Sequence, residues 1–224
     1  MKLYRIITCL FVLLIVSCKD ASKTENKSRV DSLPYYADAN FTPNWFESDD
    51  ERLIDFHRIP AFSLVDQSGD VITEKTFDDK IYIADFFFTT CPGICPKMTA
   101  NMKVLQDEFI KDDDVLLLSH SVTPKTDSIP VLKRYAENKG IVATKWHLVT
   151  GDRKQIYDLG RKSYFAEEDL GEFKTDDDFL HTENFVLIDQ NRHIRGIYNG
   201  LNKTAVQQLI ADIETLKKKD RARL

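Results

Sequence analysis

The sequence predicts one α/β domain in which a central mixed sheet is flanked by helices and preceded by an N-terminal hairpin. Three observations support this fold class. Apolar runs rich in β-branched and aromatic residues alternate with segments of helical periodicity. Near the carboxyl end, two strand-like segments separated by a short turn precede an amphipathic segment. The 224 residues, 42% of them hydrophobic, suit one core with attachments.

The segment 81–98, IYIADFFFTTCPGICPKM, joins the first core strand to the first core helix. Residues 81–88 are almost entirely apolar, which predicts a buried strand. From Pro96 onward, apolar residues recur every three or four positions, which predicts a helix. Cys91 and Cys95 therefore lie in the intervening turn, where the helix dipole and unpaired backbone N–H groups favour a thiolate.

Two segments precede this strand. Residues 62–66 and 71–73 predict a small hairpin with Gly69 in its turn. Upstream, residues 32–60 contain aromatic residues and prolines without clear periodicity. We expect them to form an extended arm that packs on the domain, with a short strand near residues 53–59.

Strands and helices alternate after the cysteines. We expect a strand over residues 115–119, a helix over 128–139 closed by Gly140, a strand over 146–149 and a helix over 152–164. Residues 166–180 are acidic and aperiodic, which predicts an inserted loop. A hairpin of residues 185–189 and 193–198 and a helix over 204–219 follow. This order, with two cysteines before the first core helix, is the layout of a thioredoxin-like domain.

The amino terminus has the pattern of a targeting segment. Basic residues precede an apolar run over 6–16, which is about half the ~20 residues that a membrane-spanning helix needs. The following Ser17-Cys18 completes a resemblance to the bacterial lipobox, which predicts lipidation of Cys18; an ordinary cleaved signal or an uncleaved anchor is the alternative. The expected divisions are a signal peptide (1–17), a flexible tether (18–31), the arm (32–60) and the domain (61–219).

Cysteine usage narrows the chemistry. Cys9 leaves with the signal and Cys18 carries lipid, so Cys91 and Cys95 remain in the exported body. A lone pair in an oxidising compartment is a structural disulfide, a redox couple or a metal site. The loop between them is too short for a disulfide to remove much chain entropy. Two thiolates suit a soft ion such as Cu(I).

Metal binding by two thiolates invites a third ligand, most often histidine. His181 ends the acidic loop and precedes a hairpin strand whose start lies beside the cysteine turn in thioredoxin-like folds. His120 follows a core strand at the same sheet edge and is the second candidate. The remaining histidines, His57, His147 and His193, lie in the arm or inside predicted strands.

Asp85 is a carboxylate inside a buried apolar strand, where its pKa should be raised. It precedes Cys91 by the spacing at which thioredoxins carry a buried acid that relays protons to their second cysteine. We hypothesise that Asp85 acts likewise on Cys95. In the alternative, the strand turns Asp85 toward a polar partner or an edge.

The segment FFFTTCPGICPKM is similar to the F-T-x-C-P-x-x-C-P segment of the Sco/SenC family of copper chaperones. Three further landmarks of that family appear in order: residues 121–127 (SVTPKTD), residues 146–151 (WHLVTG) and residues 181–189 (HTENFVLID). The resemblance covers roughly residues 58–218. It implies that Cys91, Cys95 and His181 bind copper.

The resemblance also implies a function and a location. Such proteins are membrane-tethered copper metallochaperones that face the compartment where the copper centre of cytochrome c oxidase is assembled. We therefore expect a lipoprotein of the bacterial cell envelope that faces the periplasm. Its partners would be the copper-receiving oxidase subunit and a thiol reductant of the same compartment. The net charge of -5, with both signs interspersed, gives no reason to propose nucleic acid.

Two residues depart from the family pattern, and a second function stays open. Gly93 stands where the family often has Asp, and Thr123 replaces the Asp of S-V-D-P; neither change removes a ligand. The alternative function is an exported thiol-disulfide oxidoreductase that acts on cysteines of an oxidase subunit or another client. A peroxiredoxin-like peroxidase is disfavoured, because the P-x-x-x-T/S-x-x-C approach is missing.

Overall fold

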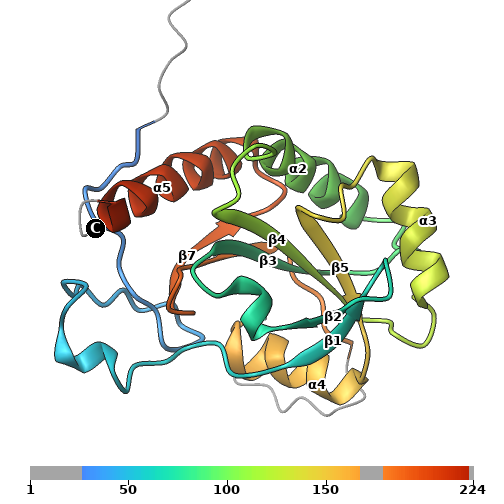
Figure 1. The fold of residues 1–224 in the computed structure, drawn as a ribbon, viewed down its shortest axis with the longest axis horizontal. Coiled ribbons are helices and arrows are strands. Elements are labelled where there is room, and N and C mark those ends of the chain that lie inside the picture. Colours follow the sequence, from blue (N-terminus) through green and yellow to red (C-terminus); the bar gives the residue numbers. More distant parts are fainter. Residues whose placement is uncertain (1–26, 167–178, 222–224) are drawn as a thin grey trace, which may run out of the picture.

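The computed structural model describes residues 27–166 and 179–221 (Figure 1). A seven-stranded mixed sheet in the order β2-β1-β5-β4-β3-β6-β7 forms its centre, with helices on both faces. This arrangement confirms the predicted fold class. The elements are η1 (Glu51–Leu53), β1 (Ser63–Asp66), β2 (Val71–Thr73), η2 (Glu74–Phe77), β3 (Ile81–Phe87), α2 (Cys95–Glu108), β4 (Val115–Ser121), α3 (Ile129–Lys139), β5 (Trp146–Thr150), α4 (Arg153–Asp158), η3 (Leu159–Ser163), β6 (Asn184–Ile188), β7 (Ile194–Asn199) and α5 (Lys203–Arg221).

Strand β3 lies inside the sheet, parallel to its neighbour β4 and antiparallel to its other neighbour β6. All seven of its residues are buried, which explains its almost continuous apolar sequence. Its side chains alternate between two cores. Ile81, Ile83 and Phe87 pack with residues of α2, α3 and α5, whereas Tyr82 and Phe86 pack with residues of α4 on the other face (Figure 1).

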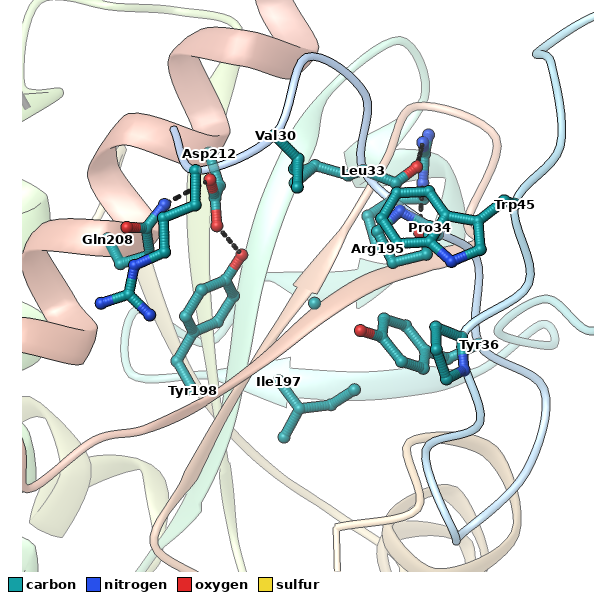
Figure 2. A pocket seen from close by; sticks show the side chains of 13 residues that line it. Val30, Leu33, Pro34, Tyr36, Trp45, Arg195, Ile197, Tyr198, Gln208 and Asp212 are labelled. Carbon is teal, nitrogen blue, oxygen red and sulfur yellow. Dashed lines mark hydrogen bonds between the residues drawn. The ribbon is translucent and has the colours of Figure 1, made fainter. Parts of the chain in front are cut away.

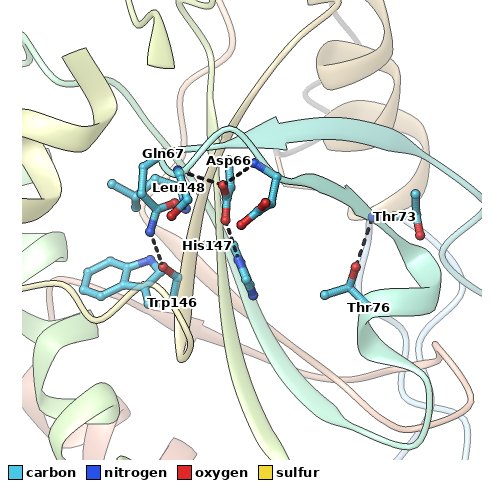
Figure 3. Close-up of polar contacts among 9 residues, drawn as sticks. Asp66, Gln67, Thr73, Thr76, Trp146, His147 and Leu148 are labelled. Atoms are coloured by element: carbon cyan, nitrogen blue, oxygen red, sulfur yellow. Dashed lines mark hydrogen bonds and ion pairs between the residues drawn. The ribbon is translucent and has the colours of Figure 1, made fainter. Parts of the chain in front are cut away.

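The β1–β2 hairpin is joined to the core through β5. Gly69 lies in the turn with a φ of 89°, as its predicted position requires. Where β1 ends, the Gln67 side chain continues the pairing: it donates to the Trp146 carbonyl at 2.8 Å and accepts from the Leu148 N–H at 2.7 Å (Figure 3). These bonds hold β5 in register with the hairpin.

The carboxylate of the preceding residue, Asp66, is buried at the same end of β1. It accepts hydrogen bonds from the backbone N–H groups of Ser68 and Asp70 at 2.8 and 3.1 Å. Its second oxygen pairs with His147 Nδ1 at 2.9 Å (Figure 3). Strands β5 and β4 separate this corner from β3.

The arm packs against the edge of the sheet through backbone and side-chain bonds. Tyr36 forms an antiparallel bridge with Ile194 of β7. The buried Arg195 donates to the Pro34 carbonyl at 3.0 Å and pairs with Asp189 at 3.0 Å. An arm that packs on the domain is what the sequence predicts.

The strand predicted near residues 53–59 is absent from the described structure, so that prediction was wrong. The chain instead forms the short 3₁₀ helix η1, because the Asp50 side chain accepts a bond from the Arg52 N–H and caps the turn. Leu53 is the buried residue of this turn.

A cavity of about 280 Å³ lies between the arm, β7 and α5 (Figure 2). Tyr36 and Trp45 of the arm line one side. On the other side, Tyr198 and Gln208 donate to the two oxygens of Asp212, at 2.7 and 2.8 Å. The buried Asp212 carboxylate is thus satisfied by its own neighbours.

The helix predicted over residues 152–164 is present, but its second half is not α-helical. α4 ends at Asp158 and continues as one π-helical turn, η3. A Cβ placed on Gly160 would stand 2.5 Å from Cδ1 of Leu180 and 3.0 Å from the Phe86 ring. Because Gly160 has no side chain, Leu180 packs closely against it and is fully buried. Residues 167–178 of the predicted acidic loop lie outside the described residues.

Candidate metal and redox centre

Cys91 lies in the turn between β3 and α2, as the sequence predicted, whereas Cys95 already belongs to the helix; both are free thiols. Cys95 is the first residue of α2 and is 4% exposed, whereas Cys91 is partly exposed in the preceding turn. The two thiols lie close enough for each to influence the pKa of the other. One sulfur is therefore accessible, and the other is held against the core.

The two thiols differ in acidity. Burial would raise the pKa of Cys91, but hydrogen bonds from Cys95 and from the backbone N–H groups of Gly93 and Ile94 lower it overall. Burial and the bond to Cys91 raise the pKa of Cys95 to about 12. Cys91 is consequently the more ready nucleophile and ligand, and Cys95 must lose its proton before it can react.

Asp85 faces the same side of the sheet as Cys95, not an edge. It is 2% exposed in the central strand, and its charge contributes to raising the pKa of Cys95. Burial raises the pKa of Asp85 itself to about 7, although a bond with the Ser119 hydroxyl lowers it. Its Oδ1 atom is buried without a hydrogen-bond partner in the described part of the chain. A carboxyl group able to exchange protons near neutral pH thus lies on the face that α2 covers.

His181 lies on the exposed chain that leads into β6. Its neighbour Leu180 is fully buried, and the Phe179 ring lies 5.2 Å from that of Phe88, which precedes the cysteine turn. The segment carrying His181 therefore approaches the turn. Among residues 27–166 and 179–221, however, no three His, Cys, Asp or Glu side chains are grouped closely enough to hold a metal ion.

His120, the second candidate, faces away from the cysteines. It is fully buried and its ring stacks on Phe86 at 4.7 Å, in the core on the α4 side. Burial lowers its pKa to about 4. His120 pairs with Phe86, the residue after Asp85. Because successive residues of a strand point to opposite faces, Asp85 faces α2 and His120 faces the other side of the sheet.

Asp127 is the residue whose importance sequence reasoning missed. Its fully buried carboxylate accepts bonds from the Thr89 hydroxyl and backbone N–H and from the hydroxyls of Ser121 and Thr123. The sequence signal that could have found it is the pair of hydroxyl residues, Ser121 at the end of β4 and Thr123 just after it, followed by the acid. That pattern did not reveal Thr89 as a partner.

The expected lipidation site, Cys18, lies outside the described residues. Within the part of the chain that the structure describes, no helix combines the length and apolar character needed to cross a membrane.

Comparisons with known proteins agree on one family. The SCO1/SenC family model matches residues 54–218. The chain is similar to BsSco, a member of the Sco family of cytochrome c oxidase assembly proteins in which a disulfide switch has been identified. The identity is 29%, the TM-score is 0.60, and the match covers 71% of this chain and 93% of that one.

Two further solved structures are similar. One is a SCO1/SenC family lipoprotein from Bacillus anthracis, with 29% identity, a TM-score of 0.63 and coverage of 72% of this chain and 95% of that one. The other is ScoI from Bradyrhizobium japonicum with copper bound, with 24% identity, a TM-score of 0.54 and coverage of 70% and 98%. The family model spans most of the domain and includes both cysteines, and on this ground the chain belongs to the SCO1/SenC family.

Proposed function

We propose that this protein is a copper chaperone that holds one copper ion through Cys91, Cys95 and His181 and helps to assemble the copper site of a cytochrome c oxidase. The observation that carries the proposal is the pair of free thiols, one partly exposed and one buried, at the start of α2. The family supports it, because BsSco belongs to the oxidase assembly proteins and the Bradyrhizobium relative binds copper.

The thiols suit a soft cargo ion. The lowered pKa of Cys91 makes its thiolate available, and copper binding would displace the proton of Cys95. His181 would supply the third ligand from the segment that Phe179 brings toward Phe88. Exchange with a disulfide of a partner protein, which would accept two electrons and leave as a dithiol, would join the two sulfurs of the pair, remove both sulfur ligands and release the ion.

A second function, thiol-disulfide exchange, is favoured by the position of Asp85. The Cys91 thiolate would attack a client disulfide and expel one client thiolate. Cys95 would give its proton to Asp85 and attack the Cys91 sulfur, which forms the internal disulfide and frees the second client thiolate. The pKa of Asp85, about 7, suits this proton transfer.

Copper titration of the reduced protein separates the two functions. Wild type should bind one Cu(I) tightly, His181→Ala should bind much more weakly, and a His57→Ala control in the arm should bind as wild type does. If His181→Ala binds copper as wild type does while the dithiol still reduces disulfides, the three-ligand chaperone is refuted and the oxidoreductase remains.

We further propose that Cys18 carries the lipid that anchors the protein on the periplasmic side of a bacterial membrane. The similarity to a lipoprotein from Bacillus anthracis supports the lipid attachment. Metabolic labelling with a tagged fatty acid should modify wild type but not Cys18→Ser. Equal labelling of both would refute anchoring through Cys18.

A further inference from the structure

We propose that Asp127 is a positioning residue that ties the Cys91 turn to the loop after β4 and thereby sets how closely the two thiols approach. The inference deepens the proposed function and rests on it as far as copper is concerned. The expected effect of Asp127 on the Cys91–Cys95 dithiol-disulfide equilibrium does not depend on copper binding.

Four bonds converge on the Asp127 carboxylate. The Thr89 hydroxyl donates to Oδ1 at 2.6 Å. Oδ2 accepts from the Ser121 hydroxyl at 2.6 Å, from the Thr123 hydroxyl at 3.0 Å and from the Thr89 N–H at 3.2 Å. Four bonds approach the full accepting capacity of an ionised carboxylate. The group is fully buried, so breaking these bonds without replacement is costly.

The bonds to Asp127 constrain the turn that carries Cys91. Cys95 is held by α2, whereas Cys91 belongs to a turn in which residues 92–94 are exposed. Thr89 lies near the start of that turn and gives Asp127 two of its four bonds. The Cys91 N–H donates to the Phe88 carbonyl at 3.4 Å, next to Thr89. Asp127 therefore holds the end of the turn that α2 does not hold.

Thr123 adds a hydrogen bond to Asp127 that an aspartate at the same position would not make. The resemblance places an Asp at this position in the family, and a carboxylate there could not donate to Asp127 unless it were protonated. The Thr123 hydroxyl does donate, at 3.0 Å. The replacement of the family's Asp by Thr123 therefore adds one hydrogen bond to the Asp127 carboxylate.

The experiment measures the Cys91–Cys95 dithiol-disulfide equilibrium against dithiothreitol in copper-free, full-length protein. Loosening the turn lowers the effective concentration of one thiol for the other. Asp127→Ala should lower the equilibrium constant for disulfide formation on the order of tenfold, and Thr89→Val about threefold, as expected for lost bonds to a charged group. Asp127→Asn should recover most of the loss, because its amide oxygen still accepts.

Asp66→Ala is the matched control, because it also removes a buried carboxylate that accepts two backbone bonds and contacts a third partner. It should lower the thermal midpoint while leaving the equilibrium constant within about twofold of wild type. Both Asp127→Ala and Thr89→Val should also bind copper more weakly in the reduced protein. The copper dissociation constant should rise more in Asp127→Ala than in Thr89→Val.

The outcomes are distinct. Unchanged dithiol constants in both Asp127→Ala and Thr89→Val, or an equal shift in Asp66→Ala, would overturn the inference. If Asp127→Ala does not fold, Thr89→Val decides, because it removes one hydroxyl and keeps the shape of the side chain. If wild type binds no copper, the chaperone proposal fails while the dithiol measurement still tests Asp127.

Discussion

Replacing Asp85 with Asn should make the protein more stable at alkaline pH while changing little at acidic pH. Asp85 is buried in β3, and burial raises its pKa from 3.8 to about 7. An amide of nearly the same shape carries no charge at either pH. The substitution therefore isolates the free energy of burying an ionised carboxylate.

The sign follows from proton linkage. Between the unfolded pKa near 3.8 and the folded pKa near 7, the folded state keeps a proton that the unfolded state has released. The stability that Asp85 contributes is thus fully present below pH 3.8 and is lost as the pH rises through 7. The difference between the two pKa values, at about 1.4 kcal/mol per pH unit, corresponds to about 4 kcal/mol.

Urea unfolding of reduced, copper-free protein at pH 4 and pH 8 measures this change. The stability of Asp85→Asn relative to wild type should increase between the two pH values by about 4 kcal/mol. Asp79→Asn is a suitable control, because Asp79 is exposed and its φ of 59° suits Asn equally well. A relative stability of Asp85→Asn that is the same at both pH values, within about 1 kcal/mol, would show that ionising Asp85 in the core costs little free energy.

Three further predictions concern other parts of the fold. Burial lowers the pKa of His120 to about 4, so wild type should lose stability as the pH falls from 6.5 to 4, and His120→Phe should lose less, as followed by circular dichroism. Gly160→Ala should destabilise the protein by about 1–3 kcal/mol, because the new methyl group overlaps Leu180; thermal unfolding measures this. Iodoacetamide at pH 7 should alkylate Cys91 well before Cys95, as read by peptide mass spectrometry.

Each of these predictions has a contrary result. Equal acid sensitivity of wild type and His120→Phe would show that another group governs acid unfolding. A thermal midpoint for Gly160→Ala no lower than that of Gly93→Ala, whose Cβ meets nothing within 4 Å, would show that Leu180 relaxes freely. Faster alkylation of Cys95 would reverse the assignment of the nucleophile.

The sheet and the position of the cysteines could be predicted because their signals are local. The apolar run over residues 81–88 corresponds to β3 (Ile81–Phe87), and the hairpin turn at Gly69 is where it was expected. The arm was harder. A cap supplied by Asp50 outweighs the strand-like composition of residues 53–59, and the bridge between Tyr36 and Ile194 joins segments that no local pattern connects.

The site was partly predictable for the same reason. The strand-helix boundary locates Cys91 and Cys95, but whether a neighbouring side chain faces them depends on register. His120 ends on the face opposite Cys95, although it lies at the predicted sheet edge. The bond between Thr89 and Asp127 joins residues far apart in sequence, so its existence follows only from the folded pairing of β3 with β4.

The central place of β3 also affects the order in which the protein can assemble during synthesis. β3 and the cysteine turn leave the ribosome early, and β4 follows soon after, but β6, the other neighbour of β3, is among the last strands made. Until β6 arrives, one edge of β3 is unpaired and the segment bearing His181 is missing. The nascent chain therefore exposes both Cys91 and Cys95 before the fold that buries Cys95 is complete.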